Sequence, residues 1–165
     1  MFAGNPCVLQ VGALRVGVTN GDVLKELMSN SYRKWGKWRG LSGRQDKGVD
    51  NQALFCAQLV EQRSLYPLYP VLSTPLDSSR IRSLSCDAFP DIQIIATDKM
   101  KFAKEVKGTL FVSPGPLALG NGGGTYARIT VYPFKQAVLD NAREKGSESI
   151  PNDVVKRCKA EIVAL

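Results

Sequence analysis

Short apolar runs and strict alternation of side chains predict six strands along this chain. Residues 8–11 and 14–18 form two short apolar stretches joined by Gly12-Ala13, and a two-residue link that begins with glycine is typical of a hairpin. Residues 91–96 are largely apolar apart from Gln93, as expected for a central strand buried on both faces, and residues 109–112 form a similar strand. Side chains alternate over residues 125–132 and 154–163, which predicts two late strands.

Four segments have the apolar spacing and end signals of helices. They are residues 22–28, 51–63, 98–106 and 134–145. The second is expected to be capped by Asp50 or Asn51, and the third to begin at Asp98 and stop at Gly108. This order of elements indicates an α/β fold, and the length indicates one domain over residues 1–165.

The charge of the chain is concentrated in one predicted surface loop, residues 29–49. The net charge is +7, and residues 31–50 supply +4 of it, with six basic side chains against two acidic ones. Cations that can neutralise phosphates and indoles that can stack on bases occur together there, as Arg33, Lys34, Trp35, Lys37, Trp38 and Arg39. Contact with DNA, docking of an acidic protein and a solvated insertion all remain open for this loop.

The residue types that are missing exclude several kinds of chemistry. The chain has no histidine, which excludes a Ser-His-Asp or Cys-His nucleophile and any histidine-based metal site within it. Its four cysteines are widely separated with no Cys-x-x-Cys pair, so neither a zinc knuckle nor a disulfide scaffold is expected, and a reducing compartment fits best. No apolar run is long enough to span a bilayer and no secretory signal is present, so no membrane partner is expected.

A glycine-rich segment between two predicted strands invites a phosphate-binding interpretation. Its glycines are Gly120, Gly122, Gly123 and Gly124, but no Gly-Lys-Ser/Thr follows and the segment leads into a strand instead of a helix. We therefore favour a structural loop in which glycine permits a tight bend. In the strand that follows, which also contains Tyr126, Arg128 is expected to be buried or stacked and paired with a carboxylate.

Two tyrosines stand in a proline-rich connection. Tyr66 and Tyr69 precede prolines, and we expect them to anchor this connection to the sheet, although stacking on bases remains an alternative.

Four segments resemble, in order, the B-subunit family of eukaryotic DNA polymerase α, accessory subunits of the polymerase α–primase complex. They are the Asn-Pro-Cys at residues 5–7, the QRSLYPLYP at residues 62–70, the PDIQII at residues 90–95, and the segment GTLFVSPGPLALGNGGGTYARITVYP at residues 108–133. The resemblance implies a calcineurin-like phosphoesterase fold, a β-sandwich flanked by helices, of which this chain matches the C-terminal half. Such a half-domain is expected to expose an apolar surface.

The resemblance also implies a scaffold without catalytic activity. Active phosphoesterases of this fold place a Gly-His-x-His metal motif where this chain has Ala96-Thr97-Asp98-Lys99, so no metal, cofactor or catalytic residue is expected. The implied partners are the catalytic subunit of DNA polymerase α and, through it, primase, in the nucleus, with DNA contact as a further expectation. A metal-dependent phosphoesterase and a free-standing DNA-binding module remain as alternatives.

Overall fold

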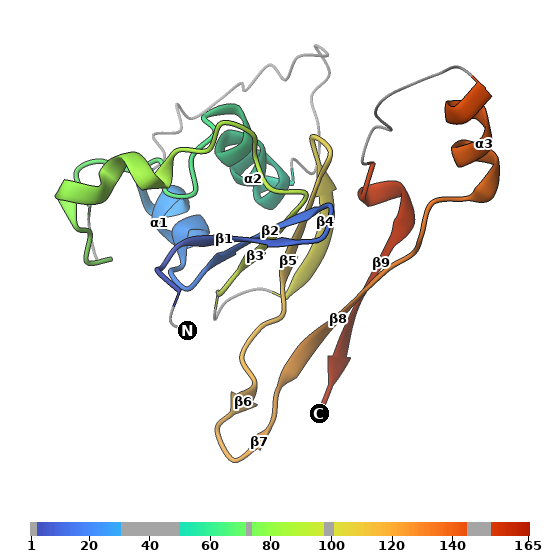
Figure 1. Ribbon diagram of the computed structural model, residues 1–165. Coiled ribbons are helices and arrows are strands. Elements are labelled where there is room, and N and C mark those ends of the chain that lie inside the picture. The colour runs from blue at the N-terminus through green and yellow to red at the C-terminus, as the bar shows by residue number, and fades with distance from the viewer. Residues whose placement is uncertain (1–2, 31–49, 72–73, 98–100, 145–152) are drawn as a thin grey trace, which may run out of the picture.

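The computed structural model describes residues 3–30, 50–71, 74–97, 101–144 and 153–165. These residues form an α/β fold, with the first two helices of the chain on one side of a large sheet, and a long two-stranded ribbon and the last helix on the other (Figure 1). In chain order the elements are β1 (Cys7–Val11), β2 (Leu14–Thr19), α1 (Val23–Asn30), α2 (Asn51–Glu61), a 3-10 helix (Ser78–Leu84), β3 (Ile92–Ile95), β4 (Phe102–Val106), β5 (Thr109–Ser113), β6 (Ala118–Leu119), β7 (Gly122–Gly123), β8 (Thr125–Val131), α3 (Gln136–Glu144), a 3-10 turn (Val155–Arg157) and β9 (Cys158–Ala164).

A five-stranded mixed sheet in the order β1-β2-β3-β5-β4 forms the centre of the molecule. Its three inner strands, β2, β3 and β5, run parallel, so their carboxyl ends meet at one edge. The hairpin β1–β2 turns at Gly12-Ala13 as predicted, and Gly12 has a φ of +60°, a conformation that glycine adopts without steric cost.

The two faces of this sheet carry separate apolar clusters. On one face, α1 and α2 pack against Ile95, Phe102 and Phe111. On the other face, the β8–β9 ribbon covers Ile92, Leu110 and Val112. Because one strand alternates its side chains between the two faces, Ile92 and Ile95 of β3 fall in different clusters. The expected α/β fold, a β-sandwich flanked by helices, is therefore confirmed.

Each of the first two helices begins at an aspartate that caps it. Asp22 Oδ1 accepts a hydrogen bond from the backbone N–H of Lys25 (3.0 Å), and Asp50 accepts from the backbone N–H groups of Gln52 and Ala53. Such caps satisfy backbone donors that have no partner inside the helix. The sequence prediction of Asp50 as a cap is confirmed.

The predicted helix at residues 98–106 is wrong where the structure describes it. Residues 102–106 form strand β4, which is antiparallel to β5 and pairs Val106 with Thr109. The two linking residues, Lys107 and Gly108, both have positive φ (51° and 79°), which is the geometry of a tight hairpin turn. Gly108 therefore turns a hairpin and does not end a helix, while Asp98 lies outside the described residues.

The last predicted strand begins later than expected. Val154 is buried in the cluster under the ribbon, with Ile92 and Leu110, but residues 155–157 form a 3-10 turn, and β9 starts only at Cys158. The turn places the Arg157 guanidinium 4.3 Å from the centre of the Phe134 ring and lets it donate a hydrogen bond to the Tyr132 carbonyl (2.8 Å). These two contacts of Arg157 join the end of β8 to the start of β9.

Candidate functional site

A cleft lies at the carboxyl ends of the three parallel strands, just beyond Thr19, Ile95 and Ser113. Its volume is about 410 Å³, and it is lined by Asn20, Asp22, Lys25, Ala96, Thr97, Pro114, Gly115 and Pro116. Ligands of open α/β sheets bind in crevices at this edge, because loops from neighbouring strands converge there. The cleft is therefore the first candidate site of the fold.

The carboxylate in this cleft is committed to structural hydrogen bonds. Asp22 Oδ1 accepts from the backbone N–H of Lys25, and Asp22 Oδ2 accepts from the Thr97 hydroxyl (2.6 Å). These bonds tie the start of α1 to the end of β3. Asp22 thus fixes the wall of the cleft.

The position of the phosphoesterase metal motif falls partly on this cleft. Ala96 and Thr97 line it, whereas Asp98 and Lys99 lie outside the described residues. Within the part of the chain that the structure describes, no three side chains of the His, Cys, Asp or Glu type gather as a metal site would require. The residues shown at this edge do not fit a two-metal centre.

The other cleft residues were not predicted from the sequence. Asn20, Lys25 and the loop of Pro114, Gly115 and Pro116 come together only because β2, β3 and β5 are parallel and adjacent. A usable signal existed for Asn20 and Pro114, which follow closely on predicted strands, at the end where parallel strands present their loops. Lys25 lies inside a predicted helix and had no such signal.

A buried polar network joins α1 to the proline-rich connection. The Glu26 side chain is 8% exposed and accepts hydrogen bonds from the Tyr66 hydroxyl and from the Thr74 hydroxyl (2.6 Å). Burial, and then the neighbouring Glu26 carboxylate, raise the pKa of Tyr66 to about 12. Tyr66 therefore anchors the proline-rich connection, although its hydroxyl bonds to α1 and not to the expected sheet. Tyr69 is 76% exposed, and the expectation is wrong for it.

We predict that Tyr66→Phe lowers the free energy of unfolding by about 1–3 kcal/mol, because the buried Glu26 loses one of its hydrogen-bond donors. The raised pKa adds a pH signature. The unfolded tyrosine ionises near 10 and the folded one near 12, so stability should fall as the pH rises through this window. Urea unfolding at pH 8 and at pH 10–11 measures both effects.

Tyr69→Phe is the matched control, since its hydroxyl belongs to an exposed side chain. It should change neither the stability nor its pH dependence. Equal effects of the two substitutions would contradict the role given to the Tyr66 hydroxyl.

The glycine-rich segment forms a small hairpin at the far end of the ribbon (Figure 1). Gly120 has a φ of +60°, and the backbone N–H of Gly124 donates to the Leu117 carbonyl. A methyl group at Gly124 would lie 2.0 Å from the Pro116 carbonyl oxygen, and one at Gly123 would lie 2.6 Å from the Leu165 carbonyl oxygen. These contacts give a steric reason for glycine at both positions.

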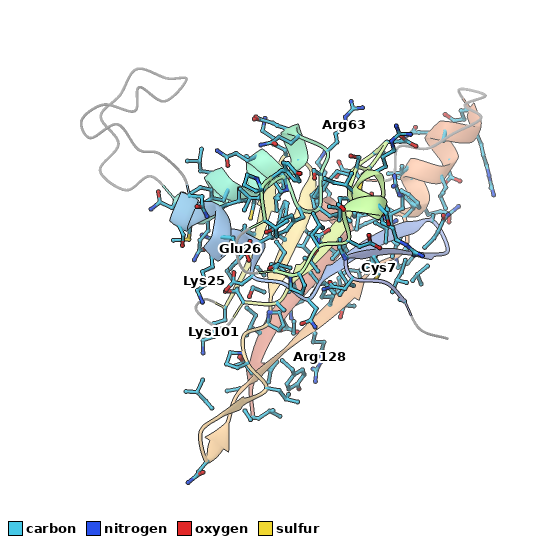
Figure 2. The ribbon with its side chains drawn as sticks, turned by 90° about the vertical axis from the view of Figure 1, so that its left-hand side faces the viewer. Cys7, Lys25, Glu26, Arg63, Lys101 and Arg128 are labelled. Atoms are coloured by element: carbon cyan, nitrogen blue, oxygen red, sulfur yellow. The ribbon has the colours of Figure 1, made fainter. Side chains whose placement is uncertain are left out.

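Arg128 does not have the surroundings predicted for it. The side chain is exposed, and its guanidinium donates a hydrogen bond to the Tyr126 hydroxyl (3.3 Å). Its ladder partner across the ribbon is Glu161, but that carboxylate forms its ion pair with Lys159 (2.6 Å). Arg128 is not buried because it lies on the face of β8 that points away from the central sheet. Figure 2 shows Arg128 on the ribbon, apart from Lys25 and Glu26 on α1.

The predicted basic contact residues Arg33, Lys34, Trp35, Lys37, Trp38 and Arg39 lie outside the described residues, and their assignment stays a prediction. The structure does not place them relative to the cleft.

Comparison with known proteins gives a family match and several relatives. Residues 1–104 match the family model described as the DNA polymerase alpha/epsilon B subunit. The B subunit of DNA polymerase alpha from Mus musculus is 28% identical over 150 residues, which cover 87% of this chain and 22% of that protein. The protein of the same name from Schizosaccharomyces pombe is 26% identical over 168 residues, covering 98% of this chain and 27% of that protein. The chain thus spans about a quarter of the length of these relatives.

Proposed function

Because the chain belongs to the B-subunit family of DNA polymerases alpha and epsilon, we propose that it is a non-catalytic accessory subunit of DNA polymerase α–primase. Its role is to bind the C-terminal region of the catalytic subunit and, through it, to tether primase for the initiation of DNA replication in the nucleus. The observation that carries the proposal is the family match over residues 1–104, together with relatives named as the B subunit of DNA polymerase alpha.

The chemistry of the cleft supports a role without catalysis. The sequence contains no histidine, and the Asp22 carboxylate is occupied by a helix cap and by the Thr97 hydroxyl. Lys25 brings a positive charge to the edge where a metal would need anionic ligands. A cleft of this composition favours a binding surface over a hydrolytic centre.

Co-purification with the catalytic subunit tests the proposal directly. The tagged C-terminal region of the large polymerase subunit is co-expressed with this chain, and a stable complex is expected on size-exclusion chromatography. The polymerase core without that region is the control, and it should not retain the chain. Elution of the chain by itself in both cases would overturn the proposal.

A hydrolysis assay separates the accessory subunit from the rival phosphoesterase. We expect no manganese-stimulated turnover of a nitrophenyl phosphodiester by the pure chain. Turnover that disappears in Asp98→Ala would favour the enzyme, because Asp98 is the acidic residue at the expected position of the metal motif.

The basic segment carries a separate proposal of DNA contact. Reversing Arg33, Lys34, Lys37 and Arg39 to glutamate should weaken binding of single-stranded DNA. The slope of log affinity against log salt should flatten by about 0.7 for each phosphate that is no longer neutralised. Fluorescence anisotropy across a salt series measures this slope.

The matched control reverses four exposed cations elsewhere, namely Lys135, Arg143, Lys156 and Lys159. It makes the same change in net charge, so a specific contact requires a larger effect from the basic segment. Equal weakening in both variants would show that only the overall charge of the chain matters.

A further inference from the structure

One lysine lines the cleft, and a second lies beside one of its loops. Lys25 lines it from α1, and a methyl group at Gly115 would lie 3.4 Å from Lys101 Cβ, which places Lys101 beside the same loop. Figure 2 shows both lysines on the same side of the molecule. Neither forms an ion pair with any side chain in the described ranges. Their two positive charges are therefore available to a ligand.

Among the described residues, two acids lie near these lysines, and neither forms an ion pair with them. Both oxygens of Asp22 accept hydrogen bonds from the protein, and Glu26 of α1 is buried and accepts from Tyr66 and Thr74. Of the charged side chains described at the cleft and its loop, two are lysines and one, Asp22, is a carboxylate. The +7 charge of the chain adds a long-range attraction of the same sign.

The shape and position of the cleft also suit a ligand. Its volume of about 410 Å³ lies within the usual range of small-molecule pockets. Pro114, Pro116 and Ala96 give it apolar walls, and Asn20 is a further polar residue of its lining. Charged donors on a mostly apolar wall are a common arrangement for recognising a compact oxyanion.

We propose that this cleft binds a phosphate group through Lys25 and Lys101 without a metal ion. The phosphate is either free or part of a nucleic-acid strand, since both present the same oxyanion to the lysines. The site goes beyond the proposed accessory function, because it exists whether or not the chain associates with a polymerase.

The test is calorimetric titration of the full chain with inorganic pyrophosphate in buffer containing EDTA. Saturable binding is expected. The variant Lys25→Gln/Lys101→Gln should bind about tenfold more weakly, since two exposed ion pairs are removed. The control pair Lys135→Gln/Lys159→Gln removes the same charge from other exposed sites and should bind within about twofold of the wild type. Circular dichroism confirms that each variant is folded.

A second titration with a short single-stranded oligonucleotide identifies the source of the phosphate. Weaker oligonucleotide binding by the cleft variant would assign the site to a nucleic-acid strand. Unchanged oligonucleotide binding with abolished pyrophosphate binding would assign it to a free phosphate. Equal pyrophosphate affinities of the cleft variant and the wild type, or binding of a polyglutamate peptide in place of pyrophosphate, would overturn the proposal.

Discussion

Replacing Phe111 with alanine is expected to lower the free energy of unfolding by about 3–5 kcal/mol. Phe111 lies in the middle of β5, is 0% exposed, and belongs to the cluster that joins the central sheet to α1 and α2. Its ring centre is 5.9 Å from that of Phe89, at a tilted angle. The substitution would leave a cavity, which β5 cannot close because it is held between β3 and β4. The loss of buried apolar surface and the cavity both lower the free energy of unfolding.

Leu119→Ala is the control for this truncation. Leu119 is 67% exposed at the tip of the β6–β7 hairpin, so its truncation should change stability by less than about 0.5 kcal/mol. Urea unfolding followed by circular dichroism measures both variants. If the free energy of unfolding of Phe111→Ala lies within about 1 kcal/mol of the wild-type value, the packing described for Phe111 is contradicted.

Strands β3 and β5 were predictable because their burial on both faces produces a continuous apolar run in the sequence. A strand covered on both faces is apolar at almost every position, as residues 92–95 and 110–112 are. The exception, Gln93, did not break the pattern, because its amide donates to the Thr19 hydroxyl of the neighbouring strand (3.0 Å). A single polar residue in a buried strand is thus compatible with the prediction.

Strand β4 was not predictable from the same kind of pattern. Only Phe102 and Val106 are buried there, and a spacing of four residues fits one face of a helix as well as alternate positions of a strand. The pairing with β5 decided between the two, supported by the ion pair of Lys104 with Asp50 at the start of α2. Long-range contacts of this kind are not visible in local spacing.

The candidate site was predicted only in part for the same reason. The motif position at Ala96 and Thr97 could be found by resemblance, because it follows a recognisable strand. Lys25 and Gly115 are far apart in the sequence, and they line one cleft because three neighbouring strands run parallel. The resemblance points to this edge of the sheet, whereas the fold shows which other side chains lie there.

Replacing Gly17 with alanine is expected to destabilise the protein by about 1–3 kcal/mol through overpacking. Gly17 of β2 faces Gln93 of β3 in the sheet, and an added methyl group would lie 2.0 Å from Gln93 Oε1 and 2.9 Å from Pro90 Cγ. Gln93 is 1% exposed, so its amide can move aside only by giving up the hydrogen bond to Thr19. A strand interior normally disfavours glycine, so the close approach of Gln93 explains its presence here.

A double-mutant cycle separates this contact from any general effect of the substitution. Gln93→Ala removes the obstructing amide, so Gly17→Ala should cost at least about 1 kcal/mol less in the Gln93→Ala background than in the wild type. Gly21→Ala is the matched control, since its nearest atoms would lie 3.7 Å away at ordinary contact distance. If Gly17→Ala costs the same stability in both backgrounds in urea unfolding, the cost arises elsewhere and the pairing of Gly17 with Gln93 does not constrain the sheet.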